Sequence, residues 1–502
     1  MINSGESHLK QIRKILLINP PWYRLFGEES PSSPLGLCYI GAVLEQNGYD
    51  VSIYNGDFTK SGVGLPSATK KTRMYDTYLR VLRDHQHPIW GEVRSIVTQQ
   101  KPDVVGISLR TSAYGSALNV SHIIKEIDSS IPIVWGGVHP TALPEESLKN
   151  SQVDIVVRGE GEYTMLDLVK NNIEKLESIP GISYKKDGQI THNPDRALIH
   201  NLDDLPFPAR HLIIDWKSCP PEALGNIFAT RGCPYSCVFC ASNKVWSRTV
   251  RYRSASNVIS ELQQLQQKFG VQQFSFEDDS FTVNKKLVNE FCSTLIKERM
   301  KIRWRCETRV DLITKDLVEQ MKKAGCEEIF LGLESGSPET LQLIKKGVTV
   351  EQMRRAVEIL RQVGIRFSAF FMIGFPWETT KEINETLNLL KELDPFAANL
   401  SIATPYPGTE LHHICTEEGV VPANMDWSTF FHQSPDMFFS NKFSRQQVRD
   451  IIAKAQAIVG KHNRNKKRQL ILSDPGYVIN RVIKGKYYYP SRLWNLIRYA
   501  WV

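Results

Sequence analysis

Three cysteines, Cys233, Cys237 and Cys240, lie in one short segment with the spacing C-x3-C-x2-C. A thiolate is a soft ligand, which favours an iron–sulfur cluster, zinc or cuprous copper. Three thiolates would leave one iron of a four-iron cluster without a protein ligand, and that iron could bind and reduce a small molecule. Zinc is an alternative, with Cys219 or a nearby histidine as fourth ligand, but the second ligand pair typical of structural zinc does not follow. Three unmodified thiols are the remaining alternative.

The chain around the cysteines alternates between short apolar segments and helical patterns. Strands are expected near 226–230, 272–276, 302–306, 328–333, 367–373 and 398–403. Between them, Pro338 occupies a first helical position, and Thr349 and Thr379 begin capping boxes. Six strand–helix units predict an incomplete parallel barrel over residues 226–411, with its active site at the carboxyl ends of the strands. The cysteine loop follows the first of these strands.

Acidic and glycine-rich segments follow the later barrel strands. They are Glu277-Asp278-Asp279 after the second strand, Glu307-Thr308-Arg309 after the third, Gly332-Leu333-Glu334-Ser335-Gly336 around the end of the fourth and Gly374-Phe375-Pro376 after the fifth. Carboxylates beside thiolates would also suit a hydrolytic metal site. However, no histidine occurs between Cys240 and His412 to supply the usual nitrogen ligands.

The cysteine loop, the acidic second-strand segment and the Gly-x-Glu-Ser-Gly segment together resemble radical S-adenosylmethionine (SAM) enzymes. The resemblance implies that the three cysteines hold a 4Fe-4S cluster whose open iron binds SAM, and that an electron from the cluster cleaves SAM to methionine and a 5′-deoxyadenosyl radical. Glu334 would then hydrogen-bond the SAM ribose, and Arg309 would pair with the methionine carboxylate. For Asp278 a solvated strand-end charge or a helix cap is expected instead. The residues implied to bind SAM are Phe239, Glu277, Asp279, Arg309, Glu334, Ser335 and Gly374.

Residues 12–170 show a second alternation of strands and helices. Strands are expected at 15–18, 51–54, 104–107, 133–135 and 155–157, with helices at about 35–47, 72–100, 115–128 and 143–150. This order predicts a doubly wound, Rossmann-like parallel sheet that binds its ligand at the carboxyl ends of the strands. A linker rich in turn signals is expected over 171–225, and a mainly helical, substrate-shaping region over 412–502.

Placed ahead of the cysteine loop, this sheet resembles the cobalamin-binding domain of cobalamin-dependent radical SAM enzymes. One departure is that the loop after the first strand, 19–34, lacks the histidine that ligates cobalt in many such domains, so that Trp22, Tyr23 or Arg24 would meet the lower face of cobalamin. Asp57 follows the wrong strand for that motif, and we attribute its match to chance. His139 could reach the corrin, but packing against Pro140 is favoured. The residues implied to bind cobalamin are Pro21, Trp22, Tyr23, Ser108, Thr111, Gly136, Gly137, His139 and Gly159.

The composition of the 502 residues, 41% hydrophobic and 23% charged, indicates two or three ordinary globular domains. No run of 18 uncharged apolar residues occurs, and residues 1–14 lack the apolar core of a signal peptide, so a cytoplasmic location is expected. Nine cysteines without a disulfide framework agree with a reducing compartment. The net charge of +8 does not predict nucleic-acid binding. The basic and aromatic stretches at 462–468 and 487–494 favour a solvated helix with a docked end over contact with an anionic membrane.

These features predict a cobalamin-dependent radical SAM enzyme that acts on a small molecule and takes electrons from a donor such as flavodoxin or ferredoxin. The favoured reaction is methyl transfer from methylcobalamin to an unactivated carbon of a natural-product or lipid-like substrate. The alternatives are an oxidative cyclase, hydroxylase or ring-rearranging enzyme of the same build, and a corrinoid sensor without catalysis. A methylthiotransferase is disfavoured, because it needs three further N-terminal cysteines and Cys38 is the only cysteine before residue 200.

Overall fold

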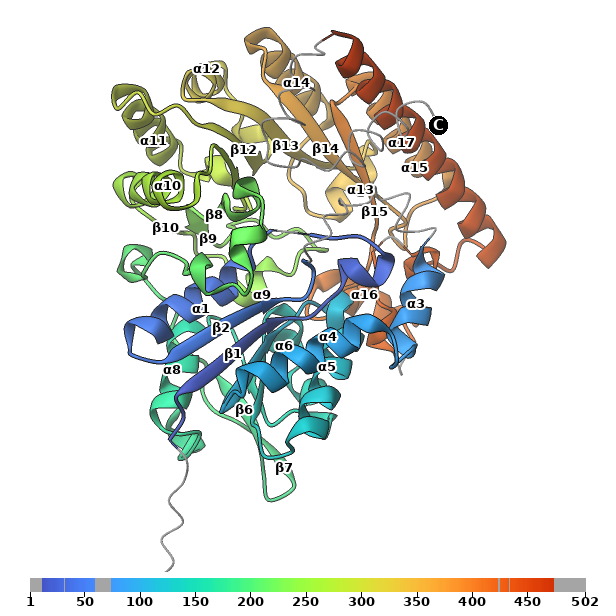
Figure 1. Ribbon diagram of the computed structural model, residues 1–502. Coiled ribbons are helices and arrows are strands. Elements are labelled where there is room, and N and C mark those ends of the chain that lie inside the picture. The colour runs from blue at the N-terminus through green and yellow to red at the C-terminus, as the bar shows by residue number, and fades with distance from the viewer. Residues whose placement is uncertain (1–10, 31, 59–73, 423–424, 433, 474–502) are drawn as a thin grey trace, which may run out of the picture.

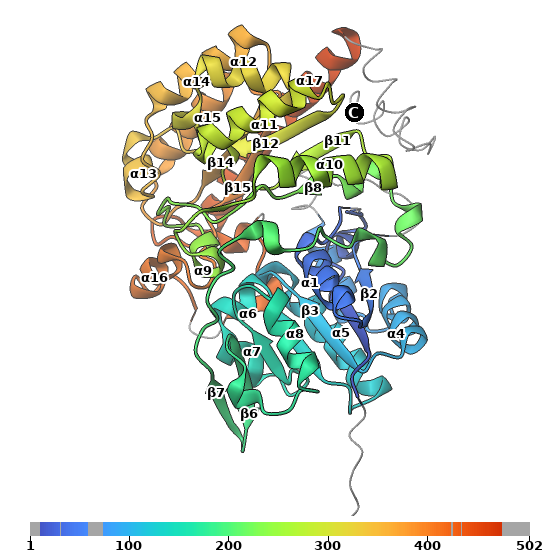
Figure 2. The ribbon, with the colours of Figure 1, turned by 90° about the vertical axis from the view of Figure 1, so that its left-hand side faces the viewer.

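Two parallel sheets organise the computed structural model, which describes residues 11–30, 32–58, 74–422, 425–432 and 434–473. The first sheet and its helices form the lower unit in Figure 1, and the second sheet with its helices forms the upper unit. Figure 2, turned by 90°, shows the same two units one above the other. None of the helices in the described part is long and apolar enough to cross a membrane.

The first sheet has seven strands in the order β2-β1-β3-β4-β5-β6-β7, and the first five are parallel. Helices α1 and α8 pack together, as do α4 and α5. Along β1, Ile15 and Leu17 join the core that contains α1 and α8, whereas Leu16 and Ile18 join the core that contains α4 and α5. Burial on both faces explains the unbroken apolar run and confirms the doubly wound sheet. The elements are β1 (Lys14–Asn19), α1 (Leu35–Gln46), β2 (Asp50–Asn55), α3 (Tyr75–Arg83), α4 (Pro88–Gln100), β3 (Val104–Ser108), α5 (Tyr114–Ile127), β4 (Ile133–Gly136), α6 (Val138–Ala142), α7 (Pro144–Lys149), β5 (Ile155–Val157), α8 (Glu162–Lys170), β6 (Ile182–Lys186) and β7 (Gln189–His192).

Two features of this unit differ from the sequence prediction. The helix expected over 72–100 is two helices, because Pro88 cannot continue α3 and instead occupies the first turn of α4. The expected linker contains the hairpin β6–β7, whose strand β6 pairs antiparallel with β5 and extends the sheet.

The second sheet has six parallel strands in the order β15-β14-β13-β12-β11-β8, as expected for an incomplete barrel. Figure 2 shows helices α10, α11, α12 and α14 as the outer layer. The predicted caps are present: Ser337 caps α13, and Thr349 and Thr379 form capping boxes with Gln352 and Glu382. The elements are β8 (Asn226–Ile227), α10 (Ala255–Phe269), β11 (Gln273–Phe276), α11 (Lys285–Lys297), β12 (Arg303–Thr308), α12 (Lys315–Lys323), β13 (Cys326–Glu334), α13 (Pro338–Leu343), α14 (Val350–Val363), β14 (Arg366–Ile373), α15 (Thr380–Leu393) and β15 (Ala397–Ile402).

The first barrel strand is shorter than predicted. β8 ends at Ile227, and the chain then forms β9 (Thr230–Arg231), which pairs antiparallel with β10 (Arg251–Tyr252). The cysteine loop and α9 (Ser242–Trp246) therefore lie between two paired strands that close their base.

The last described part of the chain packs against both units. Helix α17 (Arg445–Ser473) covers the edge strand β15, where the Asn463 amide donates to and accepts from the backbone of Ala398, at 2.9 Å each. After α16 (Glu410–Glu417), residues 427–431 lie against the first unit, where Tyr75 and Tyr78 donate to the carbonyls of Thr429 and Ser428. The expected aromatic end at 487–494 lies outside the described residues.

Candidate functional site

Buried ion pairs join the carboxyl end of β5 to the strand that leads into the cysteine loop. Glu160 accepts from Arg231 at 2.6 Å and from Arg251 at 2.7 Å, and Glu162 accepts from Arg231 at 2.6 Å. All four side chains are at most 5% exposed. We call these four residues the Glu160 cluster. It brings the ligand-binding end of the first sheet against the cysteine loop of the barrel.

Backbone contacts hold the cysteine loop in place. Gly232 has φ 102°, and a Cβ there would lie 2.4 Å from the Thr249 carbonyl oxygen, so only glycine fits. The Val238 amide donates to the Ile344 carbonyl at 3.1 Å, and the Leu411 amide donates to the Val238 carbonyl at 2.8 Å. These two hydrogen bonds fix the loop at Val238 between the end of α13 and the start of α16.

Asp278 holds the residues that lead into the cysteine loop. From the sequence, Asp278 is expected to be a solvated charge or a helix cap, and the structure corrects this. The residue is 1% exposed, and its carboxylate accepts from the Ala229 amide at 3.1 Å and the Thr230 hydroxyl at 2.6 Å. Burial raises the pKa of Asp278 to about 7, although these hydrogen bonds oppose the shift. Its role is to position the segment between β8 and β9.

The three loop thiols are partly exposed, whereas the other six cysteines, including Cys219, are buried. Within the described part of the chain, no three His, Cys, Asp or Glu side chains are close enough to hold a single metal ion. A four-iron cluster instead spreads three cysteine ligands over three separate irons, so the donor set of one loop fits it.

Glu334 has a strained backbone at the end of β13. Its φ is 64°, which is rare for a residue other than glycine, and the strand bulges between Gly332 and Glu334. The side chain is buried and accepts from Lys346 Nζ at 2.8 Å. A Cβ at Gly332 would lie 2.6 Å from Glu334 Oε1, which explains the glycine. Lys346 was not singled out from the sequence, where it reads as one of several surface lysines.

Acidic side chains gather at the carboxyl ends of β11, β12 and β13. Burial raises the pKa of Glu307 to about 7, with further contributions from Glu277, Asp279 and Glu334. Burial also raises the pKa of Asp279, which accepts a hydrogen bond from Ser242 beside the cysteine loop. The predicted SAM-binding acids are thus brought together at the carboxyl ends of neighbouring strands, and we call this end of the barrel, marked by Glu277, Asp279, Glu307 and Glu334, the acidic opening.

Of three other predicted SAM-binding residues, Arg309 and Phe239 lie beside this opening and Ser335 does not. The Arg309 guanidinium lies 3.6 Å from the centre of the Tyr235 ring and bonds Asp311 at 3.0 Å. Its Nη1 is buried and has no partner among the described residues, as a ligand-binding donor would. Phe239, in the loop, lies 6.2 Å from Phe375. Ser335 points away from the opening, because its hydroxyl bonds Thr386 at 3.0 Å.

Gly374 forms a tight turn after β14. Its φ is 89°, and a Cβ would lie 2.7 Å from the Phe438 ring. Its amide donates to Glu378 at 2.7 Å, and the amide of Phe375 donates to the same oxygen at 3.1 Å. Burial raises the pKa of Glu378 to about 7. Glu378, which the sequence prediction missed, therefore fixes the conformation of this turn.

On the first unit, the predicted cobalamin-binding residues of β3, β4 and β5 meet at one edge. His139 is buried, and its Nδ1 lies 3.1 Å from the Thr111 hydroxyl, while its Nε2 has no partner among the described residues. Burial lowers the pKa of His139 to about 4, so the ring is neutral at pH 7. A Cβ on Gly159 would meet no atom within 4 Å, whereas Gly137, beside Ser108, is closed in by the Leu109 backbone. The open space at Gly159 and the unpartnered nitrogen fit a bulky polar ligand. Gly136, the remaining predicted residue here, is partly exposed.

Asp57 holds the loop after β1, a role separate from the motif match in the sequence that we attribute to chance. Asp57 is buried, and it accepts from the amides of Trp22 and Tyr23 at 2.5 and 2.6 Å. The Trp22 ring is 3% exposed and packs 5.5 Å from Phe431, while Tyr23 is partly exposed. Pro21, next to them, accepts from Ser116 at 2.6 Å. Asp57 is therefore a positioning residue of this loop.

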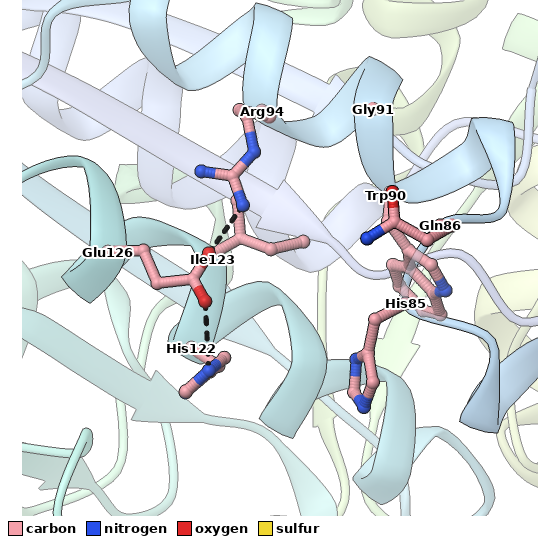
Figure 3. A pocket seen from close by; sticks show the side chains of 8 residues that line it. All are labelled: His85, Gln86, Trp90, Gly91, Arg94, His122, Ile123 and Glu126. Carbon is pink, nitrogen blue, oxygen red and sulfur yellow. Dashed lines mark hydrogen bonds and ion pairs between the residues drawn. The ribbon is translucent and has the colours of Figure 1, made fainter.

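The pocket in Figure 3 lies elsewhere, on the outer surface of α4 and α5. Its polar side chains bind one another, with Glu126 between Arg94 and His122. None of the predicted site residues lines it.

Comparisons with known proteins give two family matches along the chain. The radical SAM superfamily matches residues 227–390, and the B12 binding domain matches residues 29–169. The chain is 32% identical over 487 residues to a protein of Pyrococcus horikoshii described as an uncharacterised methyltransferase, covering 95% of this chain and 98% of that protein. It is also 32% identical to the anaerobic magnesium-protoporphyrin IX monomethyl ester cyclase of Rubrivivax gelatinosus, over 64% of this chain and 60% of the cyclase.

The fold is similar to that of a solved structure. The radical SAM methyltransferase TsrM from Kitasatospora setae, solved with cobalamin and a [4Fe-4S] cluster, superposes with a TM-score of 0.68 at 17% identity, over 89% of each chain.

Proposed function

Because the chain belongs to the cobalamin-dependent radical SAM enzymes, we propose that it transfers a methyl group to an unactivated carbon of a small molecule. Its cofactors are a 4Fe-4S cluster, SAM and cobalamin. The observation that carries the proposal is the Glu160 cluster, which places the cysteine loop against the ligand-binding end of the first sheet. A substrate between the two units could reach both sides.

In this proposal residues 12–170 bind cobalamin, residues 226–411 bind the cluster and SAM, and residues 412–502 shape the substrate pocket. When bound, the cluster and SAM supply the hydrogen-atom abstraction, and cobalamin supplies the methyl group that replaces the hydrogen. Cys233, Cys237 and Cys240 would hold the cluster. Glu334, oriented by Lys346, would bind the SAM ribose.

The other polar groups at the barrel opening would complete the SAM site. Arg309 would offer its unpartnered Nη1 to the methionine carboxylate. Gly374 lies in the turn fixed by Glu378, and the adenine would pack near this turn. Glu277 and Asp279 would lie near the methionine amino group.

On the opposite side, the first unit would bind cobalamin at the carboxyl ends of β3, β4 and β5. Thr111 and His139 would contact it, with His139 Nε2 as an available polar atom. Gly159 leaves room for the group to approach the backbone. The loop that Asp57 holds would place Trp22 and Tyr23 toward its lower face.

We prefer methyl transfer to oxidative cyclisation because the chain matches a larger share of the methyltransferase relative's length than of the cyclase relatives' length. The methyltransferase relative is matched over 98% of its length, whereas the cyclases of Rubrivivax gelatinosus and Synechocystis are matched over 60% and 81% of theirs. Cyclisation remains the second candidate, since the cyclase of Rubrivivax gelatinosus is equally identical where it does match.

The test labels the methyl group of SAM inside cells, which make SAM from methionine that carries ¹³C in its methyl group. A producing strain and its deletion strain are grown on labelled methionine, and their small molecules are compared by mass spectrometry. Methyl transfer predicts a labelled compound that disappears on deletion and returns with the wild-type gene. A gene-dependent compound without label would contradict methyl transfer and support cyclisation. We further propose that the enzyme works in the cytoplasm and takes electrons from a flavodoxin or ferredoxin.

A further inference from the structure

The inner face of the barrel carries an arginine that the proposed chemistry does not use. On β12, the buried residues Trp304 and Cys306 face the helices, so Arg303, Arg305 and Glu307 face the interior. Arg305 is exposed although it lies in the middle of a central strand. It stands two residues, about 7 Å, from Glu307 and therefore directly behind the acidic opening.

Arg305 is held in place by a hydrogen bond rather than by a direct ion pair, and Glu307, two residues along the strand, is the carboxylate whose charge interacts with it. Its Nε donates to the Ser275 hydroxyl at 3.0 Å, and its guanidinium lies 5.4 Å from the centre of the Phe330 ring. No carboxylate lies within ion-pair distance (4.0 Å) of it in the part of the chain that the structure describes. Glu328, which pairs with Arg305 in the strand register, directs its carboxylate to Ser368 instead.

Arg303 differs from Arg305 in having a carboxylate at ion-pair distance. Arg303, two residues earlier on the same face, lies 3.9 Å from Glu327, and Arg366 lies 3.7 Å from the same carboxylate. Both therefore have an acidic neighbour near the base of the barrel. Arg305 differs in that its side-chain hydrogen-bond partner is a hydroxyl and Glu307 interacts with it without a direct ion pair, so the guanidinium can still bind an anionic ligand.

An aromatic surface adjoins Arg305. Phe330 and Phe370 stack with ring centres 5.8 Å apart and an angle of 26° between their planes, and both are partly exposed on the inner face. Met372, farther along β14, is also partly exposed on this face. A flat or apolar group could pack there while an anionic group reaches the guanidinium.

We propose that Arg305 binds a carboxylate or phosphate of the substrate and that Phe330 and Phe370 pack against the apolar part next to it. This assignment rests on the proposed function, in which the substrate lies between the two units. The assignment adds that one end of the substrate passes the acidic opening into the interior of the barrel. The anionic end would lie deep in the barrel, and the carbon to be modified would lie nearer the cysteine loop. Arg305 is thus a specificity-determining residue that selects anionic substrates.

The test measures binding of three small probes to the reconstituted enzyme with SAM and without reductant, by isothermal titration calorimetry. The probes are phenyl phosphate, benzoate and the neutral benzyl alcohol, so the first two distinguish a phosphate from a carboxylate. We expect at least one anionic probe to bind the wild type, with at least tenfold weaker binding by Arg305→Met and partial recovery in Arg305→Lys. Arg303→Met is the matched control and should stay within twofold of the wild type.

Three outcomes would overturn the assignment: no anionic probe binds, Arg305→Met binds like the wild type, or Arg303→Met loses as much affinity as Arg305→Met. The same samples are then assayed for SAM cleavage after reduction, with no probe added. Failure of the wild type to cleave SAM would count against the proposed function, whereas the binding comparison judges Arg305 by itself.

Discussion

Replacing Glu160 with glutamine should loosen the strands that carry the cysteine loop. The wild-type cluster has two carboxylates and two guanidiniums, all nearly buried, and Glu160 also accepts from the Ile199 amide at 2.7 Å. Glu160→Gln keeps the shape but leaves one buried positive charge without a counter-charge. Breaking a buried ion pair costs about 3–5 kcal/mol. At 1.36 kcal/mol per tenfold change, opening of β9 and β10 should become roughly 10² to 10³·⁵ times more frequent.

Hydrogen exchange of the amides in β9 and β10, followed by mass spectrometry, measures this opening directly. Glu126→Gln is the control, because Glu126 forms a pair with Arg94 in which both side chains are more than 40% exposed. Such a pair contributes about 1 kcal/mol at most, so this control should change exchange in its own segment by less than about tenfold. Exchange in β9 and β10 of Glu160→Gln within threefold of the wild type would refute the reasoning that the Glu160 cluster holds the loop.

Three further changes test the two binding sides. Lys346→Met should weaken SAM binding, measured by equilibrium dialysis, at least tenfold, because Glu334 loses its buried cation. The control Lys345→Met removes an exposed ion pair and should leave SAM binding unchanged. Equal effects of the two variants would contradict the role of Lys346. Glu378→Gln should become more stable relative to the wild type as pH rises from about 5 to 8 in urea unfolding. The folded pKa of Glu378 is raised from 4.5 to about 7, so the wild type loses about 2.5 kcal/mol across that range, and a pH-independent difference would contradict this. Gly159→Asn should lower the cobalamin retained per chain, since asparagine tolerates the φ of 72° and its side chain enters open space, and unchanged retention would remove Gly159 from the site.

The fold could be predicted from local patterns because each pattern has a direct physical cause. Short apolar segments that alternate with helical patterns predicted both parallel sheets. Ser337, Thr349 and Thr379 predicted the helix starts correctly, because a cap is a hydrogen bond between residues close in the sequence. The hairpin β6–β7 was missed because a partly exposed edge hairpin has a weak apolar signal.

The cysteine loop and its neighbours were also predictable in part. Chemistry-bearing residues at strand ends, such as Glu334, stand out because they interrupt apolar segments. Asp57, Asp278 and Glu378 were missed or misjudged because their function depends on backbone amides distant in the chain or hidden in a turn. Lys346 could not be distinguished from Lys345 by sequence, since only packing shows which lysine is buried.

The most direct test of the central claim compares the wild type with Cys237→Ser after anaerobic reconstitution. Iron, sulfide and zinc are counted per chain, and SAM is then added with a chemical reductant. The wild type should contain about four irons and four sulfides and release 5′-deoxyadenosine, and Cys237→Ser should release none. Zinc in place of iron, or a reduced wild type that leaves SAM intact, would contradict the assignment of the three cysteines.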